Sequence, residues 1–539
     1  MISDQLRFEV QEWIKNDPDK STAEQLSKWL TENNEVELKK CFNGFLQFGT
    51  AGLRGPIGPG PSCMNRAVVS RTARGIASFM KKNNLTSVVI GKDARHGSDQ
   101  FAQDSAEILS GAGFKTYLLP RALPTPVLAF AVNKLKVDVG IMVTASHNPA
   151  IDNGYKVYLG GVVKGVNYRG SQIISPVDLE ISDEIAKADL SPVRNKTFEI
   201  VNESVIDDYI TSVSSLVTTP NQLKIVYTAL HGVGSETFIK VFEKAKFAPP
   251  ILVTEQESPD PDFPTTPFPN PEEAGAIDLA IAYAKKNNAD LVIANDPDAE
   301  RCAVAVNDLR TGWRMLRGDE VGTILGFYLI SKNKNKNKDI AVANSLVSSS
   351  LLAKIAKKNG IAFYETLTGF KWISKTNKLI FGYEEALGYC VDPAVVNDKD
   401  GISAAVIIAQ LAGELDKNKT SLCDYLDAVY EEFGFHKTEQ ISLRFNDLTQ
   451  IDDLLSRVVK NSPADLCGNK LLNAEDLSKS NSFPTPGIRL TYENQIRVII
   501  RPSGTEPKLK CYIEVVSGTN AQATSLVSQI KEALTKVLS

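Results

Sequence analysis

Four polar loops, far apart in the sequence, carry residue types that could move a phosphoryl group. The first, which we name the serine loop, comprises residues 144–149 (TASHNP) and follows the apolar run at 137–143. A buried strand that ends in a loop with a serine, a histidine and a rigid proline suits a displayed nucleophile. We therefore predict Ser146 as the nucleophile, against the plainer interpretation of a helix-capping serine.

A lysine follows the serine loop at a spacing that could bring it back toward Ser146. Gly154 permits a tight return of the chain, and Lys156 comes two residues later. A lysine near other cations in a dry cleft has a lowered pKa and can act as a base. We predict such a lowered pKa for Lys156, whereas His147, taken alone, would more often be structural than catalytic.

The second loop, the acidic loop at 296–301 (DPDAER), places three carboxylates at alternate positions. Asp296, Asp298 and Glu300 would project to one side of an extended segment. Three anionic groups facing one point repel each other unless a cation lies between them, and Mg²⁺ suits such hard oxygen ligands. A solvated acidic turn is the alternative, and short acidic motifs often match by chance.

The third loop, the Glu-rich loop at 382–388 (GYEEALG), has glycines at both ends. The glycines allow sharp turns that could carry Glu384 and Glu385 into a cleft. Carboxylates in a cleft can accept hydrogen bonds from sugar hydroxyls. A plain exposed turn is the alternative, and this loop on its own would favour it.

The fourth loop, the phosphate loop at 501–508 (RPSGTEPK), combines donors that suit a phosphate. Arg501 offers a planar fork, Ser503 and Thr505 offer hydroxyls, and Gly504 lets backbone N–H groups turn inward. A basic β-turn is the alternative. Other nucleotide signatures are missing from the sequence, because it has no GxxxxGK[ST] motif and residues 232–234 (GVG) lack the third glycine of a dinucleotide fingerprint.

The elements that must position these loops follow one repeated pattern. Apolar strands at 87–90, 223–227, 291–294 and 378–381 each end in a polar loop, and helices are expected near 99–112 and 235–245. Such alternation predicts α/β domains with mostly parallel sheets. Ligands bind beyond the carboxyl ends of the strands in these sheets, which is where the first three loops fall.

Both ends of the chain depart from this pattern. Residues 1–45 are predicted to be helical, with Trp13 and Trp29 as packing anchors. Near the C-terminus, strands at 488–492 and 496–500 and a helix at about 520–537 predict a smaller α+β domain. Linkers are predicted near 213–222, 310–316 and 434–440.

Composition bounds the class of protein. The 539 residues suffice for roughly three or four domains. With 60 basic and 64 acidic residues, the net charge of −4 argues against nucleic-acid or anionic-membrane partners. The seven cysteines form no CxxC pair, which favours reduced thiols in a cytoplasmic enzyme. We expect neither a signal peptide nor a membrane span.

In this order and spacing, the four loops resemble the α-D-phosphohexomutase superfamily over nearly the whole chain. Residues 49–55 (GTAGLRG), 368–373 (TGFKWI) and 382–389 look like its phosphoglucomutase-2/phosphopentomutase branch. The resemblance implies an α/β fold of four domains around a central cleft, with three mixed α/β domains and a smaller C-terminal α+β domain. The expected domains are 1–213 with an N-terminal helical extension, 214–314, 315–436 and 437–539.

The resemblance also implies a role for each candidate residue. Catalysis is expected from a phosphoserine at Ser146, from Lys156 and His147 in proton transfer, and from Arg54 near the active phosphate. One Mg²⁺ is expected on the phosphate of Ser146 and on Asp296, Asp298 and Glu300. Substrate binding is expected from Arg301 near the active phosphate, from Thr368, Gly369, Lys371, Glu384 and Glu385 around the sugar, and from Arg501, Ser503, Gly504, Thr505 and Lys508 on the distal phosphate.

The implied activity is reversible phosphoryl transfer between the 1-phosphate and the 6- or 5-phosphate of glucose, ribose or deoxyribose. The intermediate and activator would be a bisphosphate such as glucose 1,6-bisphosphate, and the protein would be a monomer or weak dimer. The alternatives are a glucose 1,6-bisphosphate synthase of the same fold or a non-catalytic sugar-phosphate sensor. Two residues depart from the superfamily pattern, Glu300 in place of an aspartate and Ala386 in place of a serine.

Overall fold

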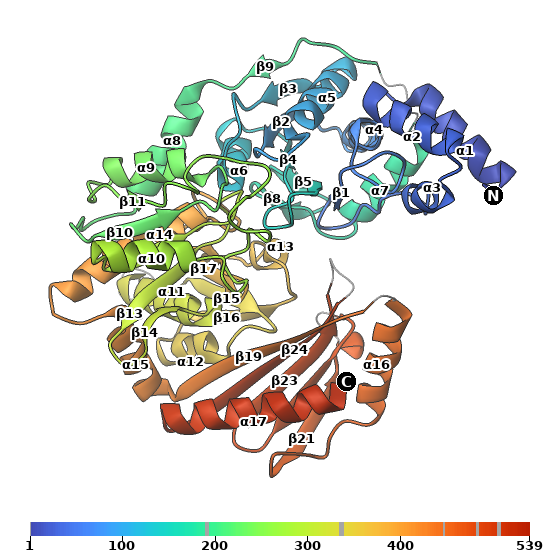
Figure 1. Ribbon diagram of the computed structural model, residues 1–539. Helices are drawn as coiled ribbons and strands as arrows, with labels where there is room; N and C mark the ends of the chain where they lie inside the picture. The colour runs from blue at the N-terminus through green and yellow to red at the C-terminus, as the bar shows by residue number, and fades with distance from the viewer. Residues whose placement is uncertain are drawn as a thin grey trace. The chain divides into compact units, whose positions relative to one another are not determined.

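The computed structural model describes residues 2–188, 193–333, 339–445, 448–480, 484–503 and 508–538. The chain divides into two compact units. The first contains Met1–Leu316 and Ala386–Glu414, and the second contains Arg317–Glu385 and Leu415–Ser539. Figure 1 shows helices alternating with strands along most of the chain, as the sequence predicts.

The N-terminal residues of the first unit form three short helices, as predicted. They are α1 (Asp4–Asn16), α2 (Lys20–Thr31) and α3 (Glu35–Cys41). Polar side chains cap all three at their N-termini, which satisfies backbone N–H groups that the helix leaves open. Trp13 is buried and its ring meets Phe42 edge-on at 6.1 Å, whereas Trp29 is only half-buried.

The first sheet has the strand order β1-β5-β4-β2-β3-β9, with β8 beside β5. Strands β2, β3, β4 and β9 run parallel, and β1 and β5 are antiparallel to their neighbours. All five residues of β4 are buried, as expected for a strand covered on both faces. The strands are β1 (Leu53–Pro56), β2 (Ser87–Lys92), β3 (Lys115–Leu118), β4 (Val139–Val143), β5 (Asp152–Leu159), β8 (Ser171–Gln172) and β9 (Glu199–Ile200). The accompanying elements are α4 (Arg66–Lys82), α5 (Ser98–Gly111), α6 (Thr125–Lys134), α7 (Val177–Lys187) and the hairpin β6 (Val162–Val163) with β7 (Val166–Asn167).

The second sheet of this unit has the order β11-β10-β12-β13-β14. Its strands are β10 (Ile225–Thr228), β11 (Ile251–Leu252), β12 (Leu291–Ala294), β13 (Ala303–Asp308) and β14 (Gly312–Met315). Its helices are α8 (Glu203–Ser214), α9 (Gly234–Lys244) and α10 (Asp278–Asn287). The segment of the chain that returns to this unit contains β18 (Gly388–Cys390), which is not a strand of this sheet, and α14 (Gly401–Asp416). The linker predicted at 310–316 is wrong, because it contains β14, paired with β13. The linker predicted near 213–222 is confirmed from residue 215 onward, because residues 215–222 connect α8 to β10 outside any helix or strand.

The second unit begins with a parallel sheet in which β15 lies between β16 and β17. Its strands are β15 (Ala341–Ser345), β16 (Ala362–Thr366) and β17 (Leu379–Glu384), and its helices are α11 (Gly318–Asn333), α12 (Leu351–Lys358), α13 (Phe370–Ile373) and α15 (Leu422–Phe433). As in the first unit, polar loops follow the carboxyl ends of these strands. The Glu-rich loop begins within β17, the strand predicted near 378–381.

An antiparallel sheet of order β19-β24-β23-β22-β21-β20 completes the second unit. The elements are β19 (Phe435–Arg444), α16 (Leu448–Lys460), β20 (Asp465–Leu466), β21 (Asn469–Asp476), the 3₁₀ turn Leu477–Lys479, β22 (Ile488–Tyr492), β23 (Ile496–Pro502), β24 (Lys508–Ser517) and α17 (Asn520–Leu538). One apolar face of the sheet packs on α16 and α17 (Figure 1). The predicted α+β domain is confirmed, but the linker predicted at 434–440 is wrong because it is part of the long strand β19.

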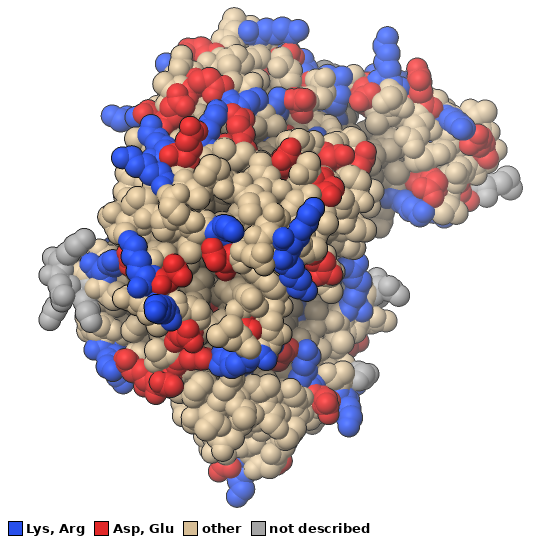
Figure 2. Space-filling model, turned by 60° about the vertical axis from the view of Figure 1, so that its left-hand side comes forward, with Lys and Arg blue, Asp and Glu red and all other residues tan. Residues whose placement is uncertain are grey.

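The face of the molecule drawn in Figure 2 carries charge of both signs. On the face drawn in Figure 2, basic and acidic side chains are interspersed over the surface. Within the described parts of the chain, none of the helices combines the length and the apolar character that crossing a membrane requires.

Candidate active site

Ser146 lies in a constrained turn immediately beyond strand β4. Its backbone has φ of 51°, in the left-handed region that residues other than glycine seldom adopt. The Ser146 N–H donates to Thr144 Oγ1 at 2.9 Å, which satisfies the buried backbone donor. The Ser146 side chain is completely buried. A strained residue held in this way is a common sign of a functional site.

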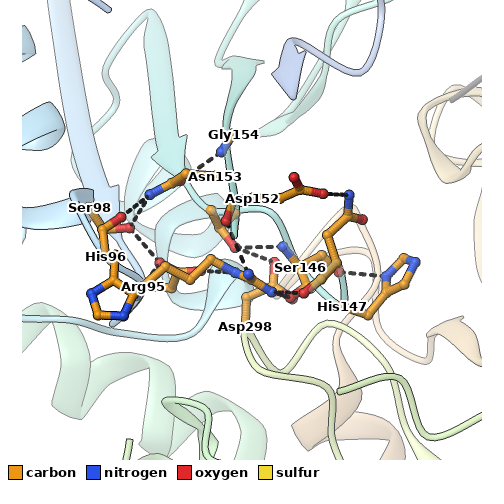
Figure 3. A network of polar contacts seen from close by, with 12 residues as sticks. Arg95, His96, Ser98, Ser146, His147, Asp152, Asn153, Gly154 and Asp298 are labelled. Carbon is orange, nitrogen blue, oxygen red and sulfur yellow. Dashed lines mark hydrogen bonds and ion pairs between the residues drawn. The ribbon is translucent and has the colours of Figure 1, made fainter. Parts of the chain in front are cut away.

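Arg95, which follows β2, holds the backbone of the serine loop in place. Its Nη2 donates to the carbonyl oxygens of Ser146 and Asn148, both at 2.6 Å. Its Nη1 donates to the carbonyls of Pro149 at 2.8 Å and Asp152 at 3.1 Å. Figure 3 shows the Arg95 side chain pointing into this loop, close to Ser146 and Asp298. One buried guanidinium therefore satisfies four carbonyls and fixes the position of the serine.

The acidic loop follows β12 and is compressed by two glycines. A turn forms where Ala299 N–H donates to the Asp296 carbonyl at 2.8 Å, with φ of 54° at Ala299. A Cβ on Gly232 would lie 2.2 Å from Pro297 Cα, and one on Gly401 would lie 2.2 Å from the Arg301 carbonyl oxygen. Because neither glycine has a side chain, the loop can pack directly against neighbouring backbone.

The acidic loop brings its three carboxylates together at Ser146. Asp296, Asp298 and Glu300 each offer an oxygen within 4.8 Å of the others, and all three are buried. Ser146 Oγ lies 2.7 Å from Asp296 Oδ2 and 3.1 Å from Glu300 Oε1. Its single proton can satisfy only one of these acceptors at a time. The structure therefore joins the predicted nucleophile to the predicted metal ligands.

Two lysines neutralise part of this negative charge. Lys156 Nζ lies 3.0 Å from Asp298 Oδ2 and 2.7 Å from Glu300 Oε2, and Lys399 Nζ lies 3.6 Å from Glu300 Oε2. Burial alone would raise the pKa of Glu300, but the two lysines hold it well below its ordinary value. Asp296 has less compensation, so burial and the charges of Asp298 and Glu300 raise its pKa to about 7.

The sequence prediction for the Lys156 pKa is wrong in sign. Burial lowers the pKa of this ammonium group, but the carboxylates of Asp298 and Glu300 outweigh burial and raise it above its ordinary value. Sequence reasoning placed Lys156 near other cations and did not include the carboxylates that contact it. In this structure Lys156 is a buried cation in an ion-pair network.

The carboxylate cluster fits a divalent metal ion. Asp298 Oδ2 accepts from Thr125 Oγ1 at 2.7 Å and from Lys156, whereas the buried Asp298 Oδ1 has no hydrogen-bond partner among the described residues. A buried carboxylate oxygen without a donor is costly unless something else satisfies it. Three hard oxygen donors around one point suit Mg²⁺ better than softer metals.

His147 and two arginines surround the serine on the remaining side. His147 Nδ1 lies 3.1 Å from Ser146 Oγ, and its Nε2 lies 3.5 Å from Arg301 Nη2. Burial, together with the charges of Arg301 and Arg54, lowers the pKa of His147 well below its ordinary value, so the imidazole is neutral. Arg54 Nη1 donates to Asn148 Oδ1 at 3.1 Å, and Arg54 Nε has no partner within the described ranges.

The predicted sugar-binding residues all lie in the second unit. Glu385 Oε2 accepts hydrogen bonds from the hydroxyls of Ser345 and Ser348, both at 2.9 Å, and Glu384 ends β17. Gly369, with φ of 101°, precedes α13, which contains Lys371. Thr368, Lys371 and Glu384 are all half-buried.

The phosphate loop is described only at its two ends. Arg501 ends β23 and Lys508 begins β24, and the Ser503 N–H donates to the Lys508 carbonyl at 2.7 Å. The buried Nε of Arg501 has no hydrogen-bond partner in the part of the chain that the structure describes. Gly504 and Thr505 lie outside the described residues.

Sequence reasoning missed three residues that support the site. Arg95 lies in the polar loop that follows β2, and its position after a predicted strand is the sequence signal that could have identified it. Thr125 contacts Asp298 through its side chain and its backbone N–H, which donates to the Asp298 carbonyl at 2.9 Å. Lys399 lies between two aspartates just before α14 and is buried. The sequence does not reveal this burial, so it gives no signal that Lys399 contributes to the site.

The chain matches family profiles along most of its length. They are the phosphoglucomutase/phosphomannomutase α/β/α domains I, II and III, at 46–191, 207–312 and 317–433, and the C-terminal domain, at 469–533. A crystal structure of a phosphoglucomutase/phosphomannomutase family protein from Burkholderia thailandensis has a TM-score of 0.69 at 19% identity, covering 91% of this chain and 97% of that one. That likeness supports the fold.

Two curated relatives cover nearly the full chain. A Haemophilus influenzae protein named probable phosphomannomutase is 46% identical, covering 88% of this chain and 98% of its own. Human phosphopentomutase is 36% identical, covering 98% of this chain and 94% of its own. The chain therefore belongs to the phosphoglucomutase/phosphomannomutase family of phosphosugar mutases, within the α-D-phosphohexomutase superfamily.

Proposed function

We propose that this enzyme moves a phosphoryl group between the 1-position and the 6- or 5-position of small sugar phosphates, using Ser146 as the carrier. The observation that carries the proposal is the position of Ser146 Oγ. It is buried in a strained turn, 2.7 Å from Asp296 and 3.1 Å from both Glu300 and His147. A solvent-exposed capping serine would show none of these contacts.

The proposed cycle begins with phosphorylated Ser146. The bond between Ser146 Oγ and phosphorus breaks as the free hydroxyl oxygen of the sugar phosphate bonds to phosphorus, which forms a sugar bisphosphate. The proton released by the sugar hydroxyl is balanced by one taken up at Ser146 Oγ. His147 is placed to exchange that proton, because its Nδ1 lies 3.1 Å from the oxygen. The bisphosphate then returns its other phosphoryl group to Ser146.

Charge around the transferred group is set by residues of the first unit. Arg301 and Arg54 supply guanidinium groups that suit phosphate oxygens, while Lys156 remains a cation between Asp298 and Glu300. Asp296, Asp298 and Glu300 would hold Mg²⁺, whose charge, when bound, offsets the charge of the phosphoryl oxygens.

Residues of the second unit are proposed to recognise the rest of the substrate. Carboxylates of Glu384 and Glu385, with Thr368, Gly369 and Lys371, would contact sugar hydroxyls. Arg501, Ser503 and Lys508 would hold the non-reacting phosphate, together with Gly504 and Thr505. The unpartnered Nε of Arg501 supports this assignment, because a buried guanidinium donor needs an acceptor.

We propose that the sugar pocket accepts pentose as well as hexose phosphates. Ala386 lacks the hydroxyl that a serine would offer at this position, which removes one potential hydrogen bond to a hexose. The human relative is named phosphopentomutase and the Haemophilus relative probable phosphomannomutase. In Ala386→Ser, the kcat/KM for glucose 1-phosphate should rise relative to the kcat/KM for ribose 1-phosphate. An unchanged ratio of the two values would argue against the assignment.

The central test is the covalent state of Ser146. Incubation with glucose 1,6-bisphosphate should add one phosphoryl group to the intact protein, and peptide mapping should locate it on Ser146. The Ser146→Ala variant should stay unmodified and lose mutase activity, whereas Ser62→Ala, a serine outside the site, should behave as the wild type. A fully active Ser146→Ala enzyme would refute the proposal.

A substrate comparison separates the mutase from a bisphosphate synthase. The isomerised monophosphate should form from glucose, ribose and deoxyribose 1-phosphates with only catalytic bisphosphate present. Net production of glucose 1,6-bisphosphate that requires a stoichiometric diphosphorylated donor would instead identify a synthase. If neither the isomerised monophosphate nor glucose 1,6-bisphosphate forms, the result would favour the sugar-phosphate sensor.

A further inference from the structure

Two buried cysteines lie side by side where the N-terminal helices meet the first α/β domain. Cys41 ends α3, and Cys63 lies in the segment at 57–65 between β1 and α4. Their thiols are close enough to interact directly, and both side chains are buried. No proposed catalytic step uses either residue, so the pair needs a separate explanation.

Backbone contacts fix the distance between the two cysteines. Ser62, the neighbour of Cys63, donates to the Cys41 carbonyl through its N–H at 3.1 Å and through its hydroxyl at 2.6 Å. Gly60 approaches so closely that a Cβ there would lie 2.7 Å from the Cys41 carbonyl oxygen and 3.0 Å from Cys41 Cβ. A disulfide requires Cα atoms within about 7 Å, and these contacts bring the segment that carries Cys63 directly against Cys41.

The segment that carries Cys63 is itself well ordered by hydrogen bonds. Asn65 Nδ2 donates to the carbonyls of Gly58 at 2.9 Å and Gly60 at 2.7 Å, and Met64 N–H donates to the Pro56 carbonyl at 2.8 Å. Both cysteines are thus presented from a fixed frame, so little ordering entropy would be lost on joining them.

The two thiols differ in acidity. Contact with the Cys41 thiol lowers the pKa of Cys63, against the opposing effect of burial, and the same contact raises the pKa of Cys41. The thiolate is the form of cysteine that attacks a peroxide, so the lower pKa of Cys63 favours it as the first site of oxidation, with Cys41 as the neighbouring thiol that resolves the product.

We propose that Cys41 and Cys63 form a reversible intramolecular disulfide when the protein meets a peroxide. The Cys63 sulfur attacks one peroxide oxygen and becomes a sulfenic acid, which releases one water. The Cys41 sulfur then attacks the Cys63 sulfur, and the hydroxyl group leaves with a proton as a second water. Two thiols are oxidised by two electrons, and one peroxide is reduced to two waters.

The disulfide would covalently close the chain between α3 and the segment that follows β1. Closing such a loop removes conformational freedom from the unfolded chain, so the oxidised protein should unfold at a higher temperature. Arg54 lies in β1, and the segment continues directly from that strand. The link would therefore tie the N-terminal helices to the part of the chain that carries one of the proposed phosphate-binding residues.

The test uses the full-length protein with Cys467→Ser, because Cys467 is the exposed cysteine in the described part of the chain and would otherwise link two copies. The protein is treated with hydrogen peroxide, denatured, alkylated and mapped by mass spectrometry. Two fewer cysteines should be labelled, one peptide pair should be linked through Cys41 and Cys63, and dithiothreitol should reverse both changes. Cys423→Ser, which changes a buried cysteine of the second unit, is the matched control and should still form the link.

Single variants make the result decisive. Cys41→Ser should accumulate sulfenic or sulfinic acid at Cys63. Cys63→Ser should leave Cys41 unmodified, and oxidation should no longer raise the unfolding temperature of this variant. Cys63→Ala repeats the measurement if the serine variant does not fold. Full labelling after oxidation, or Cys63 oxidised in the wild type without a link to Cys41, would overturn the proposal.

Discussion

Asp298 shows how one buried atom can indicate a ligand. One of its oxygens is saturated by Thr125 and Lys156, and the other has no partner among the described residues. The sequence identified the three carboxylates of the acidic loop because their alternate spacing is local. It could not pair Lys156 with these carboxylates or single out Lys399 and Thr125, because these residues come from distant segments and only the fold brings them close.

Metal binding should stabilise the protein through these carboxylates. Mg²⁺ at about 100 times its dissociation constant should stabilise the folded state by about 2.7 kcal/mol, seen as a higher unfolding temperature that a chelator reverses. Asp298→Asn should lose most of this shift, because it removes one anionic ligand. Asp308→Asn, an acidic residue outside the cluster, should keep the shift. An equal shift in both variants would exclude the cluster as the site.

Removing the Arg95 guanidinium should destabilise the serine loop. Arg95→Met leaves four carbonyls without their hydrogen-bond donor and the buried Asp93 without its ion-pair partner, a loss of about 3–5 kcal/mol for a broken buried pair. Activity should fall in addition, because Ser146 is no longer held in position. The matched control is Arg121→Met, which breaks two partly exposed ion pairs and should cost about 0–1 kcal/mol. Urea unfolding of both variants makes the comparison, and similar losses would contradict this role.

At the scale of elements, strand ends were more predictable than connections. Apolar runs at 87–90, 291–294 and 496–500 became β2, β12 and β23 because burial on one or both faces imposes their composition. The predicted linkers at 310–316 and 434–440 failed because β14 and β19 carry polar and charged residues on partly exposed strands. Polar composition there reflects the partial exposure of a strand, and composition alone does not distinguish such a strand from irregular structure.

The start of helix α14 should tolerate no side chain at Gly401. In Gly401→Ala the new Cβ would lie 2.2 Å from the Arg301 carbonyl oxygen and 2.6 Å from Asn295 Nδ2, so the acidic loop must move. We expect a loss of about 1–3 kcal/mol in stability and a weaker response to Mg²⁺. Gly161→Ala, where the Cβ meets open space, should change stability by about 0.5 kcal/mol or less. A stable Gly401→Ala protein with a normal Mg²⁺ response would show that the loop adapts.

At the scale of the whole molecule, the sequence predicted the fold class and the family, but not how the chain is shared between compact units. Residues 386–414 leave the second unit and return to the first, and the change falls inside the Glu-rich loop, between Glu385 and Ala386. No local pattern marks such a return, because it depends on long-range packing. The domain boundaries expected from the sequence, and the roles of Glu384, Glu385 and Arg501, remain predictions.

Stability of the second unit should depend on pH through Asp319. Burial raises the pKa of this carboxyl to about 7, with the charges of Glu385 and Glu514 acting in the same direction and hydrogen bonds from Ser349 and Tyr383 opposing. Because the folded pKa lies above the unfolded value of 3.8, the folded state binds the proton more tightly. The stability that Asp319 contributes is therefore present below about pH 4 and is lost as the pH rises toward 7.

The Asp319→Asn variant isolates this effect. Its amide oxygen can keep both hydrogen bonds, so above pH 7 the variant should be the more stable protein by as much as about 4 kcal/mol, and near pH 4 the two should be equal. His436 lines the same small cavity, and burial lowers its pKa to about 4. The stability that neutral His436 contributes is lost as the pH falls, and this loss should be the same in the wild type and in Asp319→Asn.

Asp308→Asn is the control of opposite sign. Arg310 and Arg314 lower the pKa of Asp308, so its contribution is present near neutral pH and disappears in acid. In urea unfolding from pH 4 to 8, Asp308→Asn should stay less stable than the wild type by a constant amount, because the folded and unfolded pKa values of Asp308 both lie below this range. Asp319→Asn should instead become more stable than the wild type as the pH rises. Parallel curves for Asp319→Asn and the wild type would mean that Asp319 is charged when folded.

The left-handed backbone of Ser146 also limits which hydroxyl-bearing residue could serve as the proposed phosphoryl carrier. Threonine carries an equally competent hydroxyl, but its branched Cβ is poorly accommodated at φ of 51°. Serine and threonine often replace each other elsewhere in proteins, but Ser146→Thr should not be tolerated at this position. The conformation of one peptide unit, more than the reactivity of the oxygen, would explain why the proposed carrier is a serine.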